Sequence, residues 1–172
     1  MPRDHAPNEF MLHPNAEALS KLPPDSLRAV IAQSLAEQER GPFRGSPDLE
    51  VTMGLGQLAR VRDVEDVEAD LLLWLCDHPT ENRYDVAGLF LMGFWASPKV
   101  AAPALVDALL RGLERYPTPG GAGDSLIMAL GNAHAHASNA QQLRIREVFG
   151  MFLPSRDRFQ DGVKQAMDRV LK

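Results

Sequence analysis

Apolar side chains recur at intervals of three and four residues along most of this chain, which is the spacing of one face of an α-helix. No segment shows the apolar–polar alternation expected of a half-buried β-strand. The pattern therefore predicts an all-α protein. The expected helices cover residues 16–22, 25–40, 48–60, 63–76, 82–96, 97–116, 124–136, 139–153 and 155–171.

The breaks between these segments have the composition of turns and helix starts. Two prolines at 23–24 and the Gly- and Pro-rich stretch 41–47 separate the first helices. Ser97 followed by Pro98 predicts a helix start, because a hydroxyl can cap the first turn and proline fits the first helical position. Residues 1–15 lack any apolar period and predict a flexible N-terminal arm, so residues 16–172 are expected to form a single helical-repeat domain.

Three residues in apolar runs are expected in the core. The segment 82–96 is apolar nearly all round, which is typical of a helix buried between layers. Trp95 belongs to it, and Trp74 and Cys76 belong to the apolar run 71–76. As the sequence has one cysteine, a disulfide framework is excluded, and we expect Cys76 to be a buried thiol.

A short string repeats in three of the expected helices. Leu-Gly-Gln-Leu-Ala at 55–59, Met-Gly-Phe-Trp-Ala at 92–96 and Leu-Gly-Asn-Ala-His at 130–134 each contain a glycine. The glycines, Gly56, Gly93 and Gly131, are 37 and 38 residues apart, and a second amphipathic segment follows each string. A glycine inside a helix costs about 1 kcal/mol relative to alanine, so its recurrence predicts close helix packing at these points.

These strings resemble those of HEAT-repeat proteins, in which an Ala-Leu-Gly string closes the first helix of each unit. The resemblance covers about residues 48–153, and a period of about 40 residues with two helices per unit is typical of HEAT and armadillo stacking. The Asp and Arg usual between the two helices are matched only in the first unit, by Arg60, Arg62 and Asp63. The resemblance implies an α-α superhelix, or HEAT-like solenoid, of about three to four antiparallel helical hairpins. It implies as well a protein-binding surface on the second helices.

Composition and charge narrow the classes of function. The chain has 172 residues, 45% hydrophobic and 24% charged, which is a globular composition. Its longest apolar run, 86–96, is shorter than the roughly 20 residues that span a bilayer, and the N-terminus lacks an apolar signal core. We therefore expect a cytoplasmic protein without membrane contact.

Charge is distributed unevenly along the chain. The net charge is −5, but residues 48–82 carry two basic and nine acidic groups, whereas residues 83–172 carry eleven basic and eight acidic groups. A net acidic protein is disfavoured as a non-specific nucleic-acid binder, although the basic half leaves a local patch open.

The sequence contains no convincing catalytic, metal or cofactor motif. His134 and His136 are two residues apart, so on a helix they point in nearly opposite directions, and Cys76 and His78 share this spacing. The glycines at 120–123 lack the preceding strand and the Gly-Lys-Ser/Thr ending of a phosphate loop. We expect no enzymatic activity, no metal and no cofactor.

The candidate binding residues lie on the expected second helices, which begin near Asp63, Pro98 and Asn139. Their acidic members form a carboxylate ridge that suits either a solvated helix face or a basic partner, and their basic members suit either ordinary surface charge or an acidic partner. The candidates for partner binding are Asp63, Asp66, Asp70, Asp107, Arg111, Arg115, Gln142 and Arg146.

Three hypotheses of function follow. The preferred one is a non-enzymatic module that binds another protein, with a bacterial immunity protein that neutralises a cognate toxin as its most specific form. The alternative is a nucleic-acid-binding HEAT-like domain that uses the basic C-terminal half. The third, a small enzyme, requires a pocket with convergent polar groups.

Overall fold

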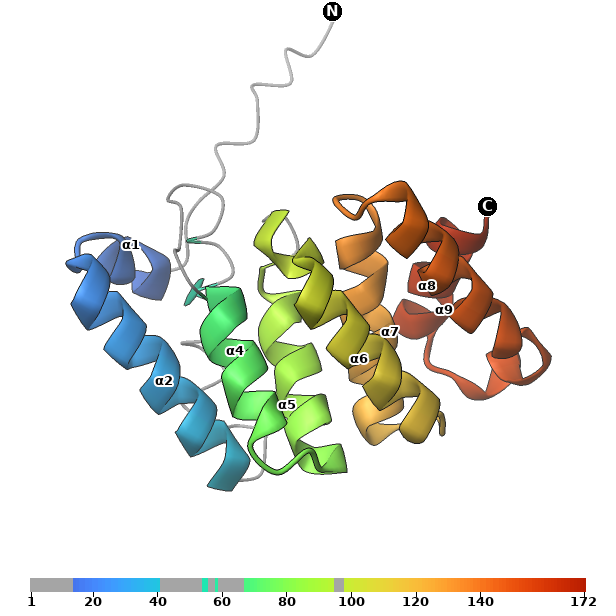
Figure 1. The fold of residues 1–172 in the computed structure, drawn as a ribbon, viewed down its shortest axis with the longest axis horizontal. Coiled ribbons are helices and arrows are strands. Elements are labelled where there is room, and N and C mark those ends of the chain that lie inside the picture. The colour runs from blue at the N-terminus through green and yellow to red at the C-terminus, as the bar shows by residue number, and fades with distance from the viewer. Residues whose placement is uncertain (1–13, 41–53, 56–57, 59–66, 95–97) are drawn as a thin grey trace, which may run out of the picture.

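Helices are the regular elements of the structure. This computed structural model describes residues 14–40, 54, 55, 58, 67–94 and 98–172 (Figure 1). The prediction of an all-α protein is confirmed for this part of the chain. The elements are α1 (Pro14–Ser20), α2 (Pro24–Arg40), α4 (Val67–Cys76), α5 (Glu81–Met92), α6 (Pro103–Arg115), α7 (Gly121–His134), α8 (Asn139–Met151) and α9 (Asp161–Leu171), with two short 3-10 helices, η1 (Pro98–Ala101) and η2 (Leu153–Arg158).

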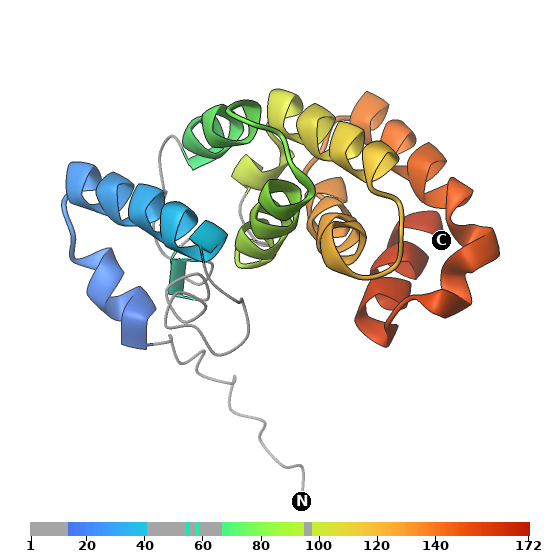
Figure 2. The ribbon, with the colours of Figure 1, turned by 90° about the horizontal axis from the view of Figure 1, so that it is seen from below.

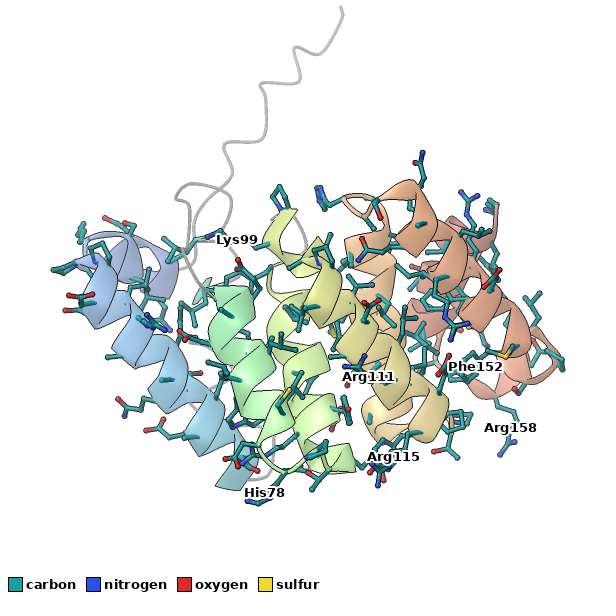
Figure 3. All side chains as sticks on the ribbon, viewed as in Figure 1. His78, Lys99, Arg111, Arg115, Phe152 and Arg158 are labelled. Atoms are coloured by element: carbon teal, nitrogen blue, oxygen red, sulfur yellow. The ribbon has the colours of Figure 1, made fainter. Side chains whose placement is uncertain are left out.

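The helices form two rows. Figure 2 shows α2, α4, α6 and α8 along the outer side of a curved arrangement, with α5, α7 and α9 inside it. Within each row a helix packs on the next but one along the chain: α4 on α6 and α6 on α8 outside, α5 on α7 and α7 on α9 inside. Helices α4, α5 and α6 run in alternating directions, since His78 and Arg115 lie along the lower edge of the view and Lys99 lies towards the upper edge (Figure 3). The candidate second helices therefore lie on the outer row.

The core lies between the rows and is filled by aliphatic and phenylalanine side chains. Phe90 of α5 is fully buried and its ring centroid lies 5.1 Å from that of Phe94. Leu109 of α6, Leu130 of α7 and Phe149 of α8 are also fully buried. Helix α5 buries most of its circumference, whereas Asp85, Leu89 and Met92 on the remaining side are only partly buried, so the expected cover on nearly all sides is found in part.

Glycines set the distance between inner helices. A Cβ at Gly88 would lie 2.6 Å from the carbonyl carbon of Ser125, so α5 and α7 touch backbone to backbone. At Gly131, one of the three repeat glycines, a Cβ would lie 3.2 Å from Ala166 Cβ of α9, which fits the expected packing role. Gly93 caps the C-terminus of α5 instead, and Gly56 lies outside the described residues.

Two expected helices are each divided in the structure. The segment 97–116 was expected to be continuous, but η1 ends at Ala101 and α6 begins at Pro103. Pro103 lacks an N–H and disfavours helical backbone at the residue before it, and Ala102 accordingly has ψ 128°. The proposed cap Ser97 lies outside the described residues. The segment 155–171 is likewise divided into the end of η2 and α9.

Other boundaries differ by a few residues. The N-terminal arm lies outside the described residues up to residue 13, and α1 begins at Pro14, two residues before the helix expected there. Helix α7 begins at Gly121, three residues before the expected Asp124. Of the expected helix at 48–60, only residues 54, 55 and 58 are described, and Leu55 and Leu58 are buried.

The expected burial of Cys76 is wrong, because its thiol is exposed. On α4 the core-facing residues are Val67, Leu71 and Leu75, and Cys76 is turned about 100° away from Leu75. Trp74 is only partly buried against the core, and Trp95 lies outside the described residues. None of the helices in the described ranges has the length and apolarity needed to cross a bilayer.

Candidate binding surface

The acidic ridge was predicted on the expected helix 63–76. Of its candidate residues only Asp70 of α4 belongs to the described part of the chain, since Asp63 and Asp66 lie outside it. The Asp70 carboxylate accepts two hydrogen bonds from Arg28 of α2, from Nε at 3.0 Å and from Nη2 at 2.6 Å. This bidentate pair joins α2 to α4. The charge of Asp70 is thus already compensated within the chain.

Gln142, another candidate, has an internal role as well. Its side-chain amide donates to the carbonyl of His134 at 3.0 Å and to that of Ala137 at 3.2 Å. The last carbonyls of a helix have no partner within the helix, and Gln142 supplies one for α7. We therefore assign Gln142 to the α7–α8 connection.

The remaining candidates are exposed on the outer row. Asp107, Arg111 and Arg115 lie on α6, and Arg146 lies on α8. Figure 3 shows Arg111 and Arg115 on the outer helix α6, and the Arg115 guanidinium lies 5.5 Å from the centre of the Tyr116 ring. Within the described ranges, Arg111 and Arg146 form neither a hydrogen bond nor an ion pair, so their charges remain available to a partner.

Exposed apolar side chains occur on α8, which carries Arg146, and on the adjoining η2, a feature that the sequence pattern did not single out. Leu143 and Met151 of α8 are 59% and 63% exposed, and Leu153 at the start of η2 is 49% exposed. Leu73 of α4, at 69%, is the other large apolar side chain exposed to this degree in the described residues. Three of these four side chains therefore lie on α8 and η2.

A groove of about 610 Å³ lies beside them, between the loop after α6 and the α8–η2 corner. Val148 and Phe152 are buried and form its floor, and the Phe152 ring packs edge-to-face on Phe159 with 6.1 Å between centroids. Met151 stands at the rim (Phe152 and Arg158 are labelled in Figure 3). The lining residues are Glu114, Pro117, Thr118, Pro119, Val148, Met151, Phe152, Ser155 and Arg158.

Both walls of the groove are fixed to the inner row. On one side the Gly120 N–H donates to Asp124 Oδ1 at 2.8 Å, which ties the loop that contains Pro117 and Pro119 to α7. On the other side Arg156 of η2 donates to both oxygens of Asp168 of α9, at 2.9 and 2.5 Å. This hydrogen-bonded pair lowers the pKa of Asp168. Hydrogen bonds to α7 and α9 therefore fix both the loop after α6 and η2, which form the two walls of the groove.

Of the two charged side chains that line the groove, the acidic one is paired and the basic one has no partner among the described residues. Glu114 Oε1 accepts a short hydrogen bond from Arg144 Nη2, so the carboxylate on one wall is paired. Arg158 on the other wall is exposed and forms no hydrogen bond or ion pair within the described part of the chain. An anionic group entering the groove thus has a cation to meet.

Two polar clusters elsewhere hold helices together. Arg83, 9% exposed, donates from Nε to Glu39 Oε1 at 2.8 Å and from Nη1 to the Trp74 carbonyl, and its guanidinium lies 4.8 Å from the centre of the Trp74 ring. It thereby joins the ends of α2 and α4 to the start of α5. The buried Ser125 hydroxyl donates to Asp85 Oδ1 and links α5 to α7.

Burial raises the pKa of Asp85, while the Ser125 hydrogen bond opposes this and the Glu81 and Asp124 carboxylates add to it. Burial also lowers the pKa of His134, with a further contribution from Arg146. Within the described residues, no group of three or more His, Cys, Asp or Glu side chains is placed to hold a metal ion.

Comparisons of the chain with models of protein families, with characterised proteins and with solved structures find no match. The HEAT-like resemblance therefore rests on the residues of this sequence alone. The function has to be inferred from the exposed side chains and the groove of α6, α8 and η2.

Proposed function

We propose that this chain is a non-enzymatic protein-binding module, and that it binds another protein through the outer surface of α6, α8 and η2. The observation that carries the proposal is the coincidence of exposed Leu143, Met151 and Leu153 with unpaired arginines on the same elements. Exposed apolar side chains that recur on one surface favour an interaction site, and methionine and arginine are enriched in protein interfaces.

We further propose that the helices form a HEAT-like stack, an α-α superhelix of about three to four hairpins. Two features support this arrangement: helices pack on the next but one within each row, and Gly131 lies against Ala166 where adjacent inner helices meet. In such a stack each hairpin covers the apolar face of its neighbour, which leaves one row of helices to present an extended surface.

The most specific form of the proposal is a bacterial immunity protein, whose partner is a cognate toxin. Its support is an analogy, since this small, acidic, all-α chain shares these properties with small helical immunity proteins. Co-purification with the product of an adjacent gene tests this form. A neighbouring product that fails to co-purify would contradict the toxin partner but not protein binding itself.

The experiment for protein binding is affinity capture from native lysate with the wild-type chain and two matched variants. Leu143→Asp places a charge within the proposed surface, and Leu73→Asp places the same charge on an exposed leucine of α4 outside it. We expect one stoichiometric partner that is retained by Leu73→Asp and lost with Leu143→Asp. Capture of no such partner, or equal capture by both variants, would contradict the proposed surface.

A second candidate function is nucleic-acid binding through the basic C-terminal half. It is favoured by the unpaired Arg111, Arg146 and Arg158, which suit phosphate contacts. Titration with duplex DNA at low and at moderate salt tests it. Since such contacts strengthen as salt falls, absence of binding even at low salt would exclude this candidate.

A further inference from the structure

We infer that the groove between the loop after α6 and the α8–η2 corner receives an acidic amphipathic segment of the partner. In this arrangement an apolar side chain fills the groove and a neighbouring carboxylate pairs with Arg158. The inference rests on the proposed protein-binding function and adds the chemistry of the partner.

The shape of the groove argues for an apolar side chain. Its floor consists of Val148 and Phe152, and prolines at 117 and 119 form much of one wall. The side chains of these four residues offer no hydrogen bond, so a polar group placed against them would lose its hydration without compensation. A volume of about 610 Å³ accommodates more than one large apolar side chain.

The rim of the groove supports the same conclusion, because Met151 there is 63% exposed. A methionine at a binding surface adapts to partners of different shape and can close over an inserted side chain. Leu153, 49% exposed, follows on η2 and extends the apolar area beyond the groove. An apolar segment with more than one apolar residue therefore fits better than an isolated side chain.

Charge determines the second part of the inference. Glu114 is already paired with Arg144, whereas Arg158 has no partner among the described residues. A basic segment would meet a charge of its own sign at Arg158, whereas an acidic one would be attracted and oriented by it. Charge complementarity thus selects an acidic segment.

The test is a fluorescence-anisotropy titration of the full chain with three labelled synthetic peptides. The first is an amphipathic helix of leucine and glutamate, the second replaces each glutamate by lysine, and the third replaces each leucine by serine. We expect saturable binding of the first peptide only. Equal binding of the lysine peptide would overturn the charge argument, and equal binding of the serine peptide would overturn the apolar one.

Variants locate the binding to the groove. Met151→Glu and Arg158→Glu are each expected to weaken binding of the glutamate peptide about tenfold or more, since each places a negative charge against the acidic peptide. Two exposed controls outside the groove, Leu73→Glu and Arg169→Glu, are expected to leave it unchanged. Both groove residues are exposed, so far-UV circular dichroism should be unaltered. Equal effects in all four variants would overturn the assignment to this groove.

A second copy of the chain is the competing occupant, because residues 48–82 are strongly acidic. Light scattering across a range of concentrations distinguishes the two. Self-association that Arg158→Glu abolishes would identify a second copy and overturn the inference. If the peptides fail while a native partner is still captured through Leu143, only the groove assignment fails. If neither is observed, protein binding fails with it.

Discussion

The backbone contact between α5 and α7 makes Gly88 a position where a single added methyl group should destabilise the fold. In Gly88→Ala the new Cβ would lie 2.6 Å from the carbonyl carbon of Ser125 and 2.7 Å from its Cβ. Real Cβ atoms do not approach other heavy atoms so closely. Since the obstacle is largely backbone, the two helices have to move apart.

The magnitude follows from two opposing contributions. Replacing a glycine by alanine inside a helix stabilises it by about 1 kcal/mol. Overpacking a filled core costs about 1–3 kcal/mol, and more where backbone has to shift. Because α5 and α7 both belong to the inner row, we expect the upper part of that range. The expected net loss in the free energy of unfolding is about 1–2 kcal/mol.

Two other glycines provide a graded control. At Gly131 a Cβ would lie 3.2 Å from the Ala166 side chain, so Gly131→Ala requires a smaller shift and we expect a change of about 1 kcal/mol or less. At Gly150 of α8 a Cβ would have nothing within 4 Å. Gly150→Ala should therefore raise stability by a few tenths of a kcal/mol, about half the full helix propensity, because it lies near the helix end.

Urea unfolding followed by far-UV circular dichroism measures all three variants. From most to least stable, the expected order is Gly150→Ala, Gly131→Ala and Gly88→Ala. The wild type is expected to lie between Gly150→Ala and Gly131→Ala, or close to Gly131→Ala. A shift of 1 kcal/mol corresponds to about 2–4 °C in Tm for a chain of this size. A Gly88→Ala variant as stable as the wild type would refute the backbone contact between α5 and α7.

Three further predictions concern single residues. Arg83→Leu leaves the half-buried Glu39 carboxylate without its partner and should lower the free energy of unfolding by about 3 kcal/mol, measured by urea unfolding; a loss below 1 kcal/mol would contradict its bridging role. Burial raises the pKa of Asp85, so its carboxyl group binds a proton more tightly in the folded state than in the unfolded state. Asp85 therefore lowers the free energy of unfolding as pH rises from the ordinary carboxyl pKa through the raised one. Asp85→Asn should remove that decline in stability between mildly acidic and neutral pH, and an unchanged pH profile would exclude Asp85 as its source. Cys76 should react with a thiol reagent in the native state nearly as fast as in urea, whereas strong protection would show that the thiol is covered.

The helices were predictable from the sequence because apolar spacing, capping residues and prolines act over only a few residues of the chain. Apolar spacing of three and four residues places most elements within a few residues of their observed bounds. The start of α8 is expected and observed at Asn139, where Ser138 caps the helix and Gln141 completes a capping box. The division at Ala102 was missed, although its cause, Pro103, is also local, because the preceding Ser97–Pro98 pair is an equally strong start motif.

The candidate surface was predictable only in part, because pairing and exposure depend on residues far apart in the sequence. Asp70 accepts hydrogen bonds from Arg28, which lies 42 residues away in the sequence, and no pattern around either residue indicates this pairing. The groove is assembled from the end of α6, its loop, α8 and η2, so its lining emerges only when these elements pack. The exposed Met151 and Leu153 look like core residues in the sequence, since apolar spacing alone does not reveal which face remains uncovered.

The most direct test of the proposed binding surface is photocrosslinking in native lysate with a photoreactive amino acid at position 151. The same group at position 73, on the exposed leucine of α4, is the matched control. The account predicts one discrete crosslinked protein from position 151 and none from position 73. Crosslinking from position 73 alone, or from neither position, would contradict binding through α6, α8 and η2.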